Sequence, residues 1–307
     1  MKKRDLLSIA DLAPEEIMRL LDRTLELKRG AQSHCLAGKS VAMLFEKPSL
    51  RTRVSFDVAV HTLGGHAIYL GRDEVGLGSR EGVSDVARVL SRYVDAIVAR
   101  TFAHQTLESL ASYATIPVVN ALSDVEHPCQ ALGDLVTIKE RAGNLEGLTI
   151  AFVGDGNNVA ASLALGAASV GANFVIASPP GYELPEAITR RASSLAASHG
   201  ATLRQVVSSK DAVRWADVGY TDVWVSMGQE AQGDQRRADF QGYQVSPKLM
   251  ALAKPNAAFM HPLPAHHNEE VAEGMLEHPQ SVVFDQAENR LHVQKAVLEH
   301  LMGDPRA

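Results

Sequence analysis

The chain has 307 residues, 46% of them hydrophobic, and carries a formal net charge of −6 at pH 7. The length predicts two domains of about 150 residues each. The negative balance argues against a nucleic-acid partner or an anionic membrane surface, so any anion site must be local and built from a few placed basic residues. With two cysteines, neither a disulfide framework nor a cysteine metal cluster is indicated, which favours a reducing cytoplasm.

The N-terminal segment predicts no targeting signal. It begins with the basic residues Lys2, Lys3 and Arg4, but Asp11 follows before the apolar core of a signal peptide can form. No apolar run is long enough to span a bilayer. We therefore expect a cytoplasmic protein.

Helix and strand patterns alternate along the first half of the chain. A helix is predicted after Pro14, where Ile17, Leu20, Leu21 and Leu25 keep a helical period. Short apolar runs predict strands at 40–45, 67–70, 96–99 and 117–120, with helices at 51–63 and 83–93 and another from about residue 130.

A break at 140–147, where charged residues and glycines cluster, precedes a second alternating segment. Here we predict strands at 148–153, 174–177, 223–225 and 258–260, and helices at 159–170 and 291–301. This alternation implies an α/β protein with two similar domains, each a mainly parallel sheet flanked by helices. We expect a first domain at 1–140, completed by a C-terminal helix at 290–303, a second domain at 147–288, and an active-site cleft between their facing strand ends.

The segment Ser49-Leu50-Arg51-Thr52-Arg53 lies where a predicted strand passes into a helix. Free backbone N–H groups and the positive end of the helix dipole lie at such a junction. Ser49 and Thr52 add hydroxyl donors, and the guanidinium groups of Arg51 and Arg53 match pairs of phosphate oxygens. The segment therefore predicts a site for a tetrahedral dianion that needs no metal, although the pattern in isolation also fits a solvated basic helix start.

Three further residues could bind the same ligand. Arg100 follows a predicted strand, at the carboxyl end where ligands of α/β proteins bind. His127 and Gln130 lie at a helix start and could polarise a carbonyl and hold an amide, although a His-Pro pair alone is more often a turn. Cys129 is more typical of a small buried hydrophobe than of a nucleophile.

A glycine-rich turn opens the second half. Gly154-Asp155-Gly156-Asn157-Asn158 resembles a dinucleotide fingerprint but lacks the third glycine, and the next strand ends in Ser178-Pro179 without the acid that holds a ribose. The better interpretation is a tight turn that exposes the two asparagines at a helix start. A plain turn remains the alternative, more so for Asn157 than for Asn158.

Partners for an amine and a carboxylate follow. Asp222 and Ser226 flank a predicted strand, and Asp222 is the natural partner of a cationic amine. In His261-Pro262-Leu263-Pro264, two prolines leave backbone carbonyls directed outward as acceptors, although a plain loop explains them equally well. Arg290 reads as an ordinary residue at the start of the final helix unless the cleft needs it.

Taken together, these motifs resemble the aspartate/ornithine carbamoyltransferase family over essentially the whole chain. Three segments stand in the order and spacing of the family, namely Phe45-Glu46-Lys47-Pro48-Ser49-Leu50-Arg51-Thr52-Arg53, His127-Pro128-Cys129-Gln130-Ala131-Leu132 and Phe284-Asp285-Gln286-Ala287-Glu288-Asn289-Arg290. The stretch from Thr221 to Gly228 resembles the ornithine branch, since the aspartate branch lacks its Ser-Met-Gly element.

The resemblance implies transfer of the carbamoyl group from carbamoyl phosphate to the δ-amine of L-ornithine, giving L-citrulline and phosphate in arginine biosynthesis or catabolism. It assigns to carbamoyl phosphate the residues Ser49, Leu50, Arg51, Thr52, Arg100, His127, Gln130 and Arg290. It assigns to ornithine the residues Asn158, Asp222, Ser226, Met227, Pro262 and Leu263. It further implies no metal, no cofactor, and a homotrimer or multiple of trimers with active sites at subunit interfaces.

We assign catalysis to four residues of these sets. Arg51, Arg100 and His127 would polarise the carbonyl of carbamoyl phosphate and stabilise the oxyanion of a tetrahedral intermediate. Asp222 would position the amine, which is mostly protonated when free at neutral pH. The transfer would be direct, with no covalent enzyme intermediate.

Three positions depart from the family pattern. Leu50 replaces a usual threonine, Pro262 stands where ornithine enzymes usually carry cysteine, and Gly76 replaces a polar residue that often reaches a neighbouring subunit. The alternative acceptors are therefore N-acetylornithine, aspartate or a diamine such as putrescine. A catalytically silent binding or regulatory relative is a further alternative, and the failed fingerprint disfavours a nucleotide-binding dehydrogenase.

Overall fold

The computed structural model describes residues 3–226 and 228–303, which form two compact units. The first unit runs to Val136 and resumes at Glu288, and the second comprises Thr137–Ala287. No helix among these described residues is long and apolar enough to cross a membrane.

The first unit is built on a four-stranded sheet in the order β2-β1-β3-β4, with every pair parallel. Its strands are β1 (Ser40–Phe45), β2 (His66–Gly71), β3 (Ala96–Arg100) and β4 (Val118–Leu122). β1 and β3 are buried almost throughout, as expected for parallel strands covered on both faces. The accompanying helices are η1 (Ile9–Asp11), α1 (Pro14–Lys28), α2 (Leu50–Thr62), α3 (Arg72–Val75), α4 (Val83–Tyr93), α5 (His104–Tyr113), α6 (Pro128–Ala142) and α12 (Val283–Met302).

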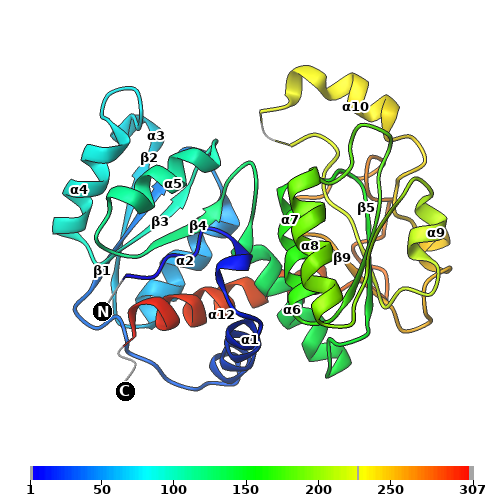
Figure 1. The fold of residues 1–307 in the computed structure, drawn as a ribbon, viewed down its shortest axis with the longest axis horizontal. Helices are drawn as coiled ribbons and strands as arrows, with labels where there is room; N and C mark the ends of the chain where they lie inside the picture. The colour runs from blue at the N-terminus through cyan, green and yellow to red at the C-terminus, as the bar shows by residue number, and fades with distance from the viewer. Residues whose placement is uncertain (1–2, 227, 304–307) are drawn as a thin grey trace. The chain divides into compact units, whose positions relative to one another are not determined.

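Helix α12 brings the end of the chain back into the first unit, where it runs beside α1 (Figure 1). Arg23 of α1 binds Glu299 at 3.0 Å, and Lys28 Nζ donates to Asn289 Oδ1 at 2.8 Å. The helix begins at Val283, so its predicted start at Leu291 was wrong, and Arg290 lies inside the helix. Hydrophobic periodicity missed these turns because their buried residues include polar ones such as Arg290.

The second unit carries a five-stranded sheet in the order β7-β6-β5-β8-β9, again parallel throughout. Its strands are β5 (Thr149–Val153), β6 (Asn173–Ala177), β7 (Leu203–Val206), β8 (Val218–Tyr220) and β9 (Ala258–Met260). Its helices are α7 (Asn158–Ser169), α8 (Glu186–Ser198), α9 (Ser209–Val213), η2 (Glu230–Gln232), α10 (Gly233–Asp239) and α11 (Pro247–Met250). The fold class predicted from the sequence, α/β with a parallel sheet in each of two parts, is confirmed.

The predicted strand at 223–225 was wrong. The strand of this region is β8, and residues 221–226 form an irregular loop beyond its carboxyl end. Trp224 is buried because its ring stacks on Phe240, with ring centroids 5.7 Å apart. The short apolar run at 223–225 therefore belongs to a loop that packs against the core. Sequence periodicity alone cannot distinguish such a loop from a strand.

Candidate active site

In each sheet the strand order reverses once, and ligands of parallel α/β sheets bind at the carboxyl ends of the two strands where this happens. In the first unit the reversal falls between β1 and β3, whose last residues Phe45 and Arg100 are paired in register. In the second unit it falls between β5 and β8. Ser49 to Arg53 and Arg100 lie at the ends of β1 and β3, and Asn158, Asp222 and Ser226 follow β5 and β8, so each unit carries one half-site.

The N-terminus of α2 forms the floor of the first half-site. Ser49 is the N-cap residue, and its Oγ accepts a hydrogen bond from the Thr52 backbone N–H at 3.3 Å. The remaining N–H groups of the first turn have no partners within the helix. Thr52 is buried, and its Oγ1 accepts from Arg290 Nη2 at 2.7 Å, which ties α12 to this turn.

Arginine side chains and His127 lie around this turn. Apart from burial, the groups that change the pKa values of Arg100 and His127 are all arginines, and no carboxylate is among them. Burial, together with the nearby guanidinium groups of Arg290 and Arg51, lowers the pKa of Arg100 to about 10. Burial also lowers the pKa of His127 well below its usual range, again assisted by Arg290 and Arg100. Each guanidinium therefore makes its neighbours harder to keep charged, a situation that a bound dianion relieves.

Gln130 lies in the first turn of α6 beside His127. Its Nε2 donates to Asp134 Oδ1 at 2.9 Å, while its buried Oε1 accepts no hydrogen bond from any described residue. An unsatisfied buried carbonyl is costly, so this oxygen suits a ligand N–H such as that of an amide. Burial raises the pKa of Cys129 to about 12, which keeps its thiol protonated and agrees with its predicted role as a small buried hydrophobe.

Two residues of the motif point elsewhere. The side chain of Leu50 is 76% exposed, so only its backbone can contribute to the anion site. Arg53 lies 3.7 Å from the centroid of the Tyr69 ring, a cation–π contact that directs its guanidinium to that ring. The structure therefore gives no support to the expectation that both Arg51 and Arg53 bind phosphate oxygens.

The second half-site begins at the β5–α7 turn. Asn157 is the N-cap of α7, with its Oδ1 accepting from the N–H groups of Val159 and Ala160. Its Nδ2 donates to Asp222 Oδ2 at 2.8 Å. Gly156 packs so closely against the Glu183 backbone that a Cβ could not be added without movement, which explains the glycine in this turn.

Asp222 is the central acid of this half-site. It is 8% exposed, and its Oδ1 accepts from the Val223 backbone N–H at 2.8 Å. Burial raises its pKa, whereas His261 and the hydrogen bonds from Asn157 and Val223 oppose the rise. A cationic amine at this carboxylate would lower the pKa again, so the site favours a positively charged partner.

The remaining predicted residues of this unit lie at the start of α7 and on the loops that follow β8 and β9. Asn158 is the first residue of α7, and the Ser226 backbone N–H donates to Gln229 Oε1 at 3.1 Å. Pro262 is buried, and Leu263 adopts a left-handed conformation with φ 57°. Met227 lies outside the described residues.

Two buried residues behind Leu263 were not assigned a role in the sequence. His261 Nδ1 accepts from the Leu263 backbone N–H at 2.9 Å, and its Nε2 lies 3.3 Å from Glu270 Oε1. Since Nδ1 is an acceptor, the ring proton is on Nε2, which donates a hydrogen bond to Glu270 Oε1. The two contacts fix the orientation of the ring and of the Leu263 backbone N–H. His261 stood within a noted motif, whereas nothing in the sequence pattern marked Glu270.

Comparison with known proteins matches both halves of the chain. Residues 4–140 match the carbamoyl-P binding domain of aspartate/ornithine carbamoyltransferase, and residues 146–301 match its Asp/Orn binding domain. Ornithine carbamoyltransferase from Pyrococcus abyssi is 50% identical over 99% of this chain and 97% of its own length, and the anabolic enzyme from Pyrococcus furiosus is 50% identical over 98% and 96%. The solved structure of the Pyrococcus furiosus enzyme superimposes with a TM-score of 0.94, covering 98% of this chain and 97% of that one.

Proposed function

Because the chain belongs to the aspartate/ornithine carbamoyltransferase family, we propose that it transfers the carbamoyl group of carbamoyl phosphate to the δ-amine of L-ornithine. The products are L-citrulline and phosphate. The observation that carries the donor is the group of buried cationic and polar side chains around the N-terminus of α2. The acceptor is supported by the buried Asp222 carboxylate and by relatives named ornithine carbamoyltransferase.

In this proposal the first half-site binds carbamoyl phosphate. The phosphate lies at the first turn of α2, bound by Ser49, Thr52, Arg51 and the Leu50 backbone N–H. The carbonyl oxygen faces Arg100 and His127, and Arg290 completes the cationic surroundings. Gln130 Oε1, which is buried and accepts no hydrogen bond from the described residues, accepts one from the carbamoyl NH₂.

The second half-site binds ornithine. Asp222 holds the δ-amine, and the Leu263 carbonyl, set by the His261–Glu270 pair, is a second acceptor for it. Asn158 and Ser226 bind the α-amino and α-carboxylate groups, together with Met227 and Pro262.

Transfer then follows from ordinary acyl chemistry. The lone pair of the deprotonated δ-nitrogen attacks the carbonyl carbon, and the C=O electrons move to an oxyanion stabilised by Arg51, Arg100 and His127. Collapse breaks the bond between carbon and the phosphate oxygen, phosphate leaves with the electron pair, and the nitrogen passes one proton to the departing phosphate. Since both substrates must be held at once in reacting geometry, orientation supplies a large part of the rate.

The assignment is tested by comparing Arg51→Ala with Arg92→Ala, which removes an exposed arginine of α4 in the same unit. We expect Arg51→Ala to lower kcat/KM for citrulline formation by at least about 1,000-fold, because the phosphate and oxyanion lose a charged donor pair. Arg92→Ala should retain wild-type turnover. Near-wild-type turnover in a folded Arg51→Ala protein would refute the assignment.

Pro262 is the feature that favours a different acceptor. It replaces a cysteine usual in ornithine enzymes, and its side chain offers no polar group to the amine. Radiolabelled carbamoyl phosphate should therefore be offered with ornithine, N-acetylornithine, aspartate and putrescine in parallel. We expect ornithine to give the highest kcat/KM; a higher value for another acceptor would reassign the substrate, and calorimetric binding of carbamoyl phosphate without any turnover would indicate a silent relative.

We further propose a cytoplasmic enzyme of arginine metabolism that forms a homotrimer or a multiple of trimers. Helix α2 supports assembly, since Leu50, Val54 and Val58 form an exposed apolar stripe at i, i+4 and i+8. Both cysteines are free thiols, which suits a reducing compartment. Light scattering should give a mass that is a multiple of three times the 33.0 kDa chain.

A further inference from the structure

The second unit contains a cavity of about 310 Å³ that none of the proposed substrate residues lines. Leu148, Asp217 and Ala258 line it, and they lie at the amino ends of β5, β8 and β9. Asp222 follows β8, so the cavity is at the opposite edge of the sheet from that carboxylate. The last turns of α6 form another wall.

Most of the wall is apolar and firmly packed. Ile138, Met260 and Val282 all line the cavity and are all buried. A cavity of this size with apolar walls and few polar groups is typical of a site for a small molecule.

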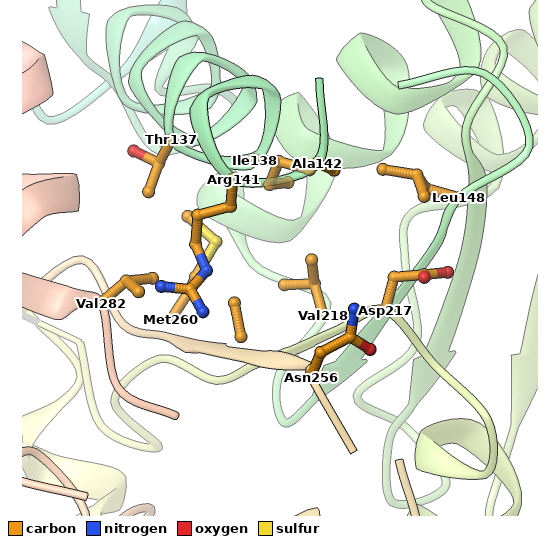
Figure 2. A pocket seen from close by; sticks show the side chains of 11 residues that line it. Thr137, Ile138, Arg141, Ala142, Leu148, Asp217, Val218, Asn256, Met260 and Val282 are labelled. Atoms are coloured by element: carbon orange, nitrogen blue, oxygen red, sulfur yellow. The ribbon is translucent and has the colours of Figure 1, made fainter. Parts of the chain in front are cut away.

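Arg141, in the last turn of α6, is the cation of this cavity. Figure 2 shows its side chain descending from the helix so that the guanidinium lies among the wall residues Val282, Met260 and Val218. Within residues 3–226 and 228–303, this guanidinium makes no hydrogen bond or ion pair. An exposed arginine at a helix end is usually solvated, but this one extends over apolar side chains.

The one carboxylate in the wall does not neutralise Arg141. The Asp217 carboxylate points away from the guanidinium (Figure 2). It binds Lys254 Nζ at 2.8 Å and accepts from the Thr149 backbone N–H at 2.9 Å. The charge presented to a ligand is therefore positive, and the amide of Asn256 lines another part of the wall, on the side of Asp217 (Figure 2).

We propose that this cavity is a binding site for a small aliphatic carboxylate. The guanidinium of Arg141 binds the two carboxylate oxygens side by side, and the Asn256 amide is a further hydrogen-bond donor. The aliphatic body packs on Met260 and Val282. No residue that lines this cavity belongs to either half-site, and the existence of the site does not depend on the proposed reaction.

The probe is 4-methylpentanoate, titrated against the full-length protein and followed by saturation-transfer difference NMR. We expect a Kd on the order of 1 mM, as for other small fragments. Arg141→Gln should weaken binding at least tenfold, and the uncharged 4-methylpentanamide should bind at least tenfold more weakly than the carboxylate. The matched control Arg204→Gln removes an exposed arginine of β7 in the same unit and should leave the Kd unchanged.

Two further variants test whether the probe binds in this cavity. Ala142→Phe fills the cavity from an exposed position, so the fold should tolerate it while binding is lost. Arg51→Gln tests whether the probe instead occupies the arginine cluster of the first unit. Binding that survives Arg141→Gln and Ala142→Phe, or that disappears in Arg51→Gln, would overturn the proposal.

Discussion

His127 shows how neighbouring charges decide the state of a single residue. Its imidazole is buried, and the two groups that lower its pKa besides burial are the guanidinium groups of Arg290 and Arg100. Neutral imidazole can donate a hydrogen bond to a carbonyl oxygen without adding a further charge to this cluster. The sequence identified His127 because it stands in a motif and Arg100 because it follows a predicted strand. It could not predict that Arg53 turns to the Tyr69 ring, since that depends on a residue brought near by β2.

The lowered pKa of His127 predicts a specific loss of stability in acid. Its folded value lies below the ordinary 6.5, so between the two values the unfolded chain binds one more proton than the folded chain. The contribution of this residue to stability is complete above pH 6.5 and is lost as the pH falls towards the folded value. Urea unfolding from about pH 7.5 down to about pH 5.5 should therefore show a smaller loss of unfolding free energy for His127→Gln than for the wild type. Parallel losses in the two proteins would contradict the assignment.

At the scale of elements, the turn from β1 into α2 combines a structural and a binding role in Ser49. Its hydroxyl caps the helix through Thr52, at the same turn where the phosphate is proposed to bind. Element positions of this kind were predictable because a short apolar run defines each strand and a helical period defines the helix: β1, α4 and β9 agree with the predicted bounds. The loop after β8 was not predictable. Its apolar residues resemble a strand in sequence, whereas Trp224 is buried by tertiary contact with Phe240.

Ser49 can be changed so that capping and binding separate. Aspartate caps a helix about as well as serine, so Ser49→Asp should keep the unfolding free energy within about 0.5 kcal/mol of wild type. Its negative charge should nevertheless raise the KM for carbamoyl phosphate at least about 100-fold through repulsion of the phosphate. Ser49→Ala should lose about 1 kcal/mol of stability with a smaller change in KM. Steady-state kinetics measures the KM, and urea unfolding measures the stability. An unchanged KM in Ser49→Asp would contradict the proposal that the phosphate binds at this turn.

At the scale of the molecule, the first unit is discontinuous and the second is not. Residues up to Val136 form a unit only with those from Glu288 onward, whereas Thr137–Ala287 is one continuous stretch. Helix α12 adds Arg290 to the first half-site and binds α1 through Glu299. The alternation of strands and helices predicts two parallel sheets, but it carries no information on the polar side chains of α12 that bury themselves among the first-unit residues.

This discontinuity predicts how a truncated chain fails. A chain that ends at Ala287 keeps every residue of the second unit but loses the α12 residues of the first, including Arg290 and its bond to Thr52. Apolar residues that α12 buries, such as Val297 and Leu298, are lost with it, and each such side chain contributes about 1.5–3 kcal/mol by burial. Since a domain is stable by only about 5–15 kcal/mol, the first unit should unfold while the second stays folded. Hydrogen exchange should then show lost protection in β1, β3 and β4. Protection should be retained in β5 and β6, which belong to the other sheet. Full protection of β1 and β3 in the truncated chain would show that the first unit does not need α12, and a loss of protection in both sheets would show that the second unit cannot stand without the first.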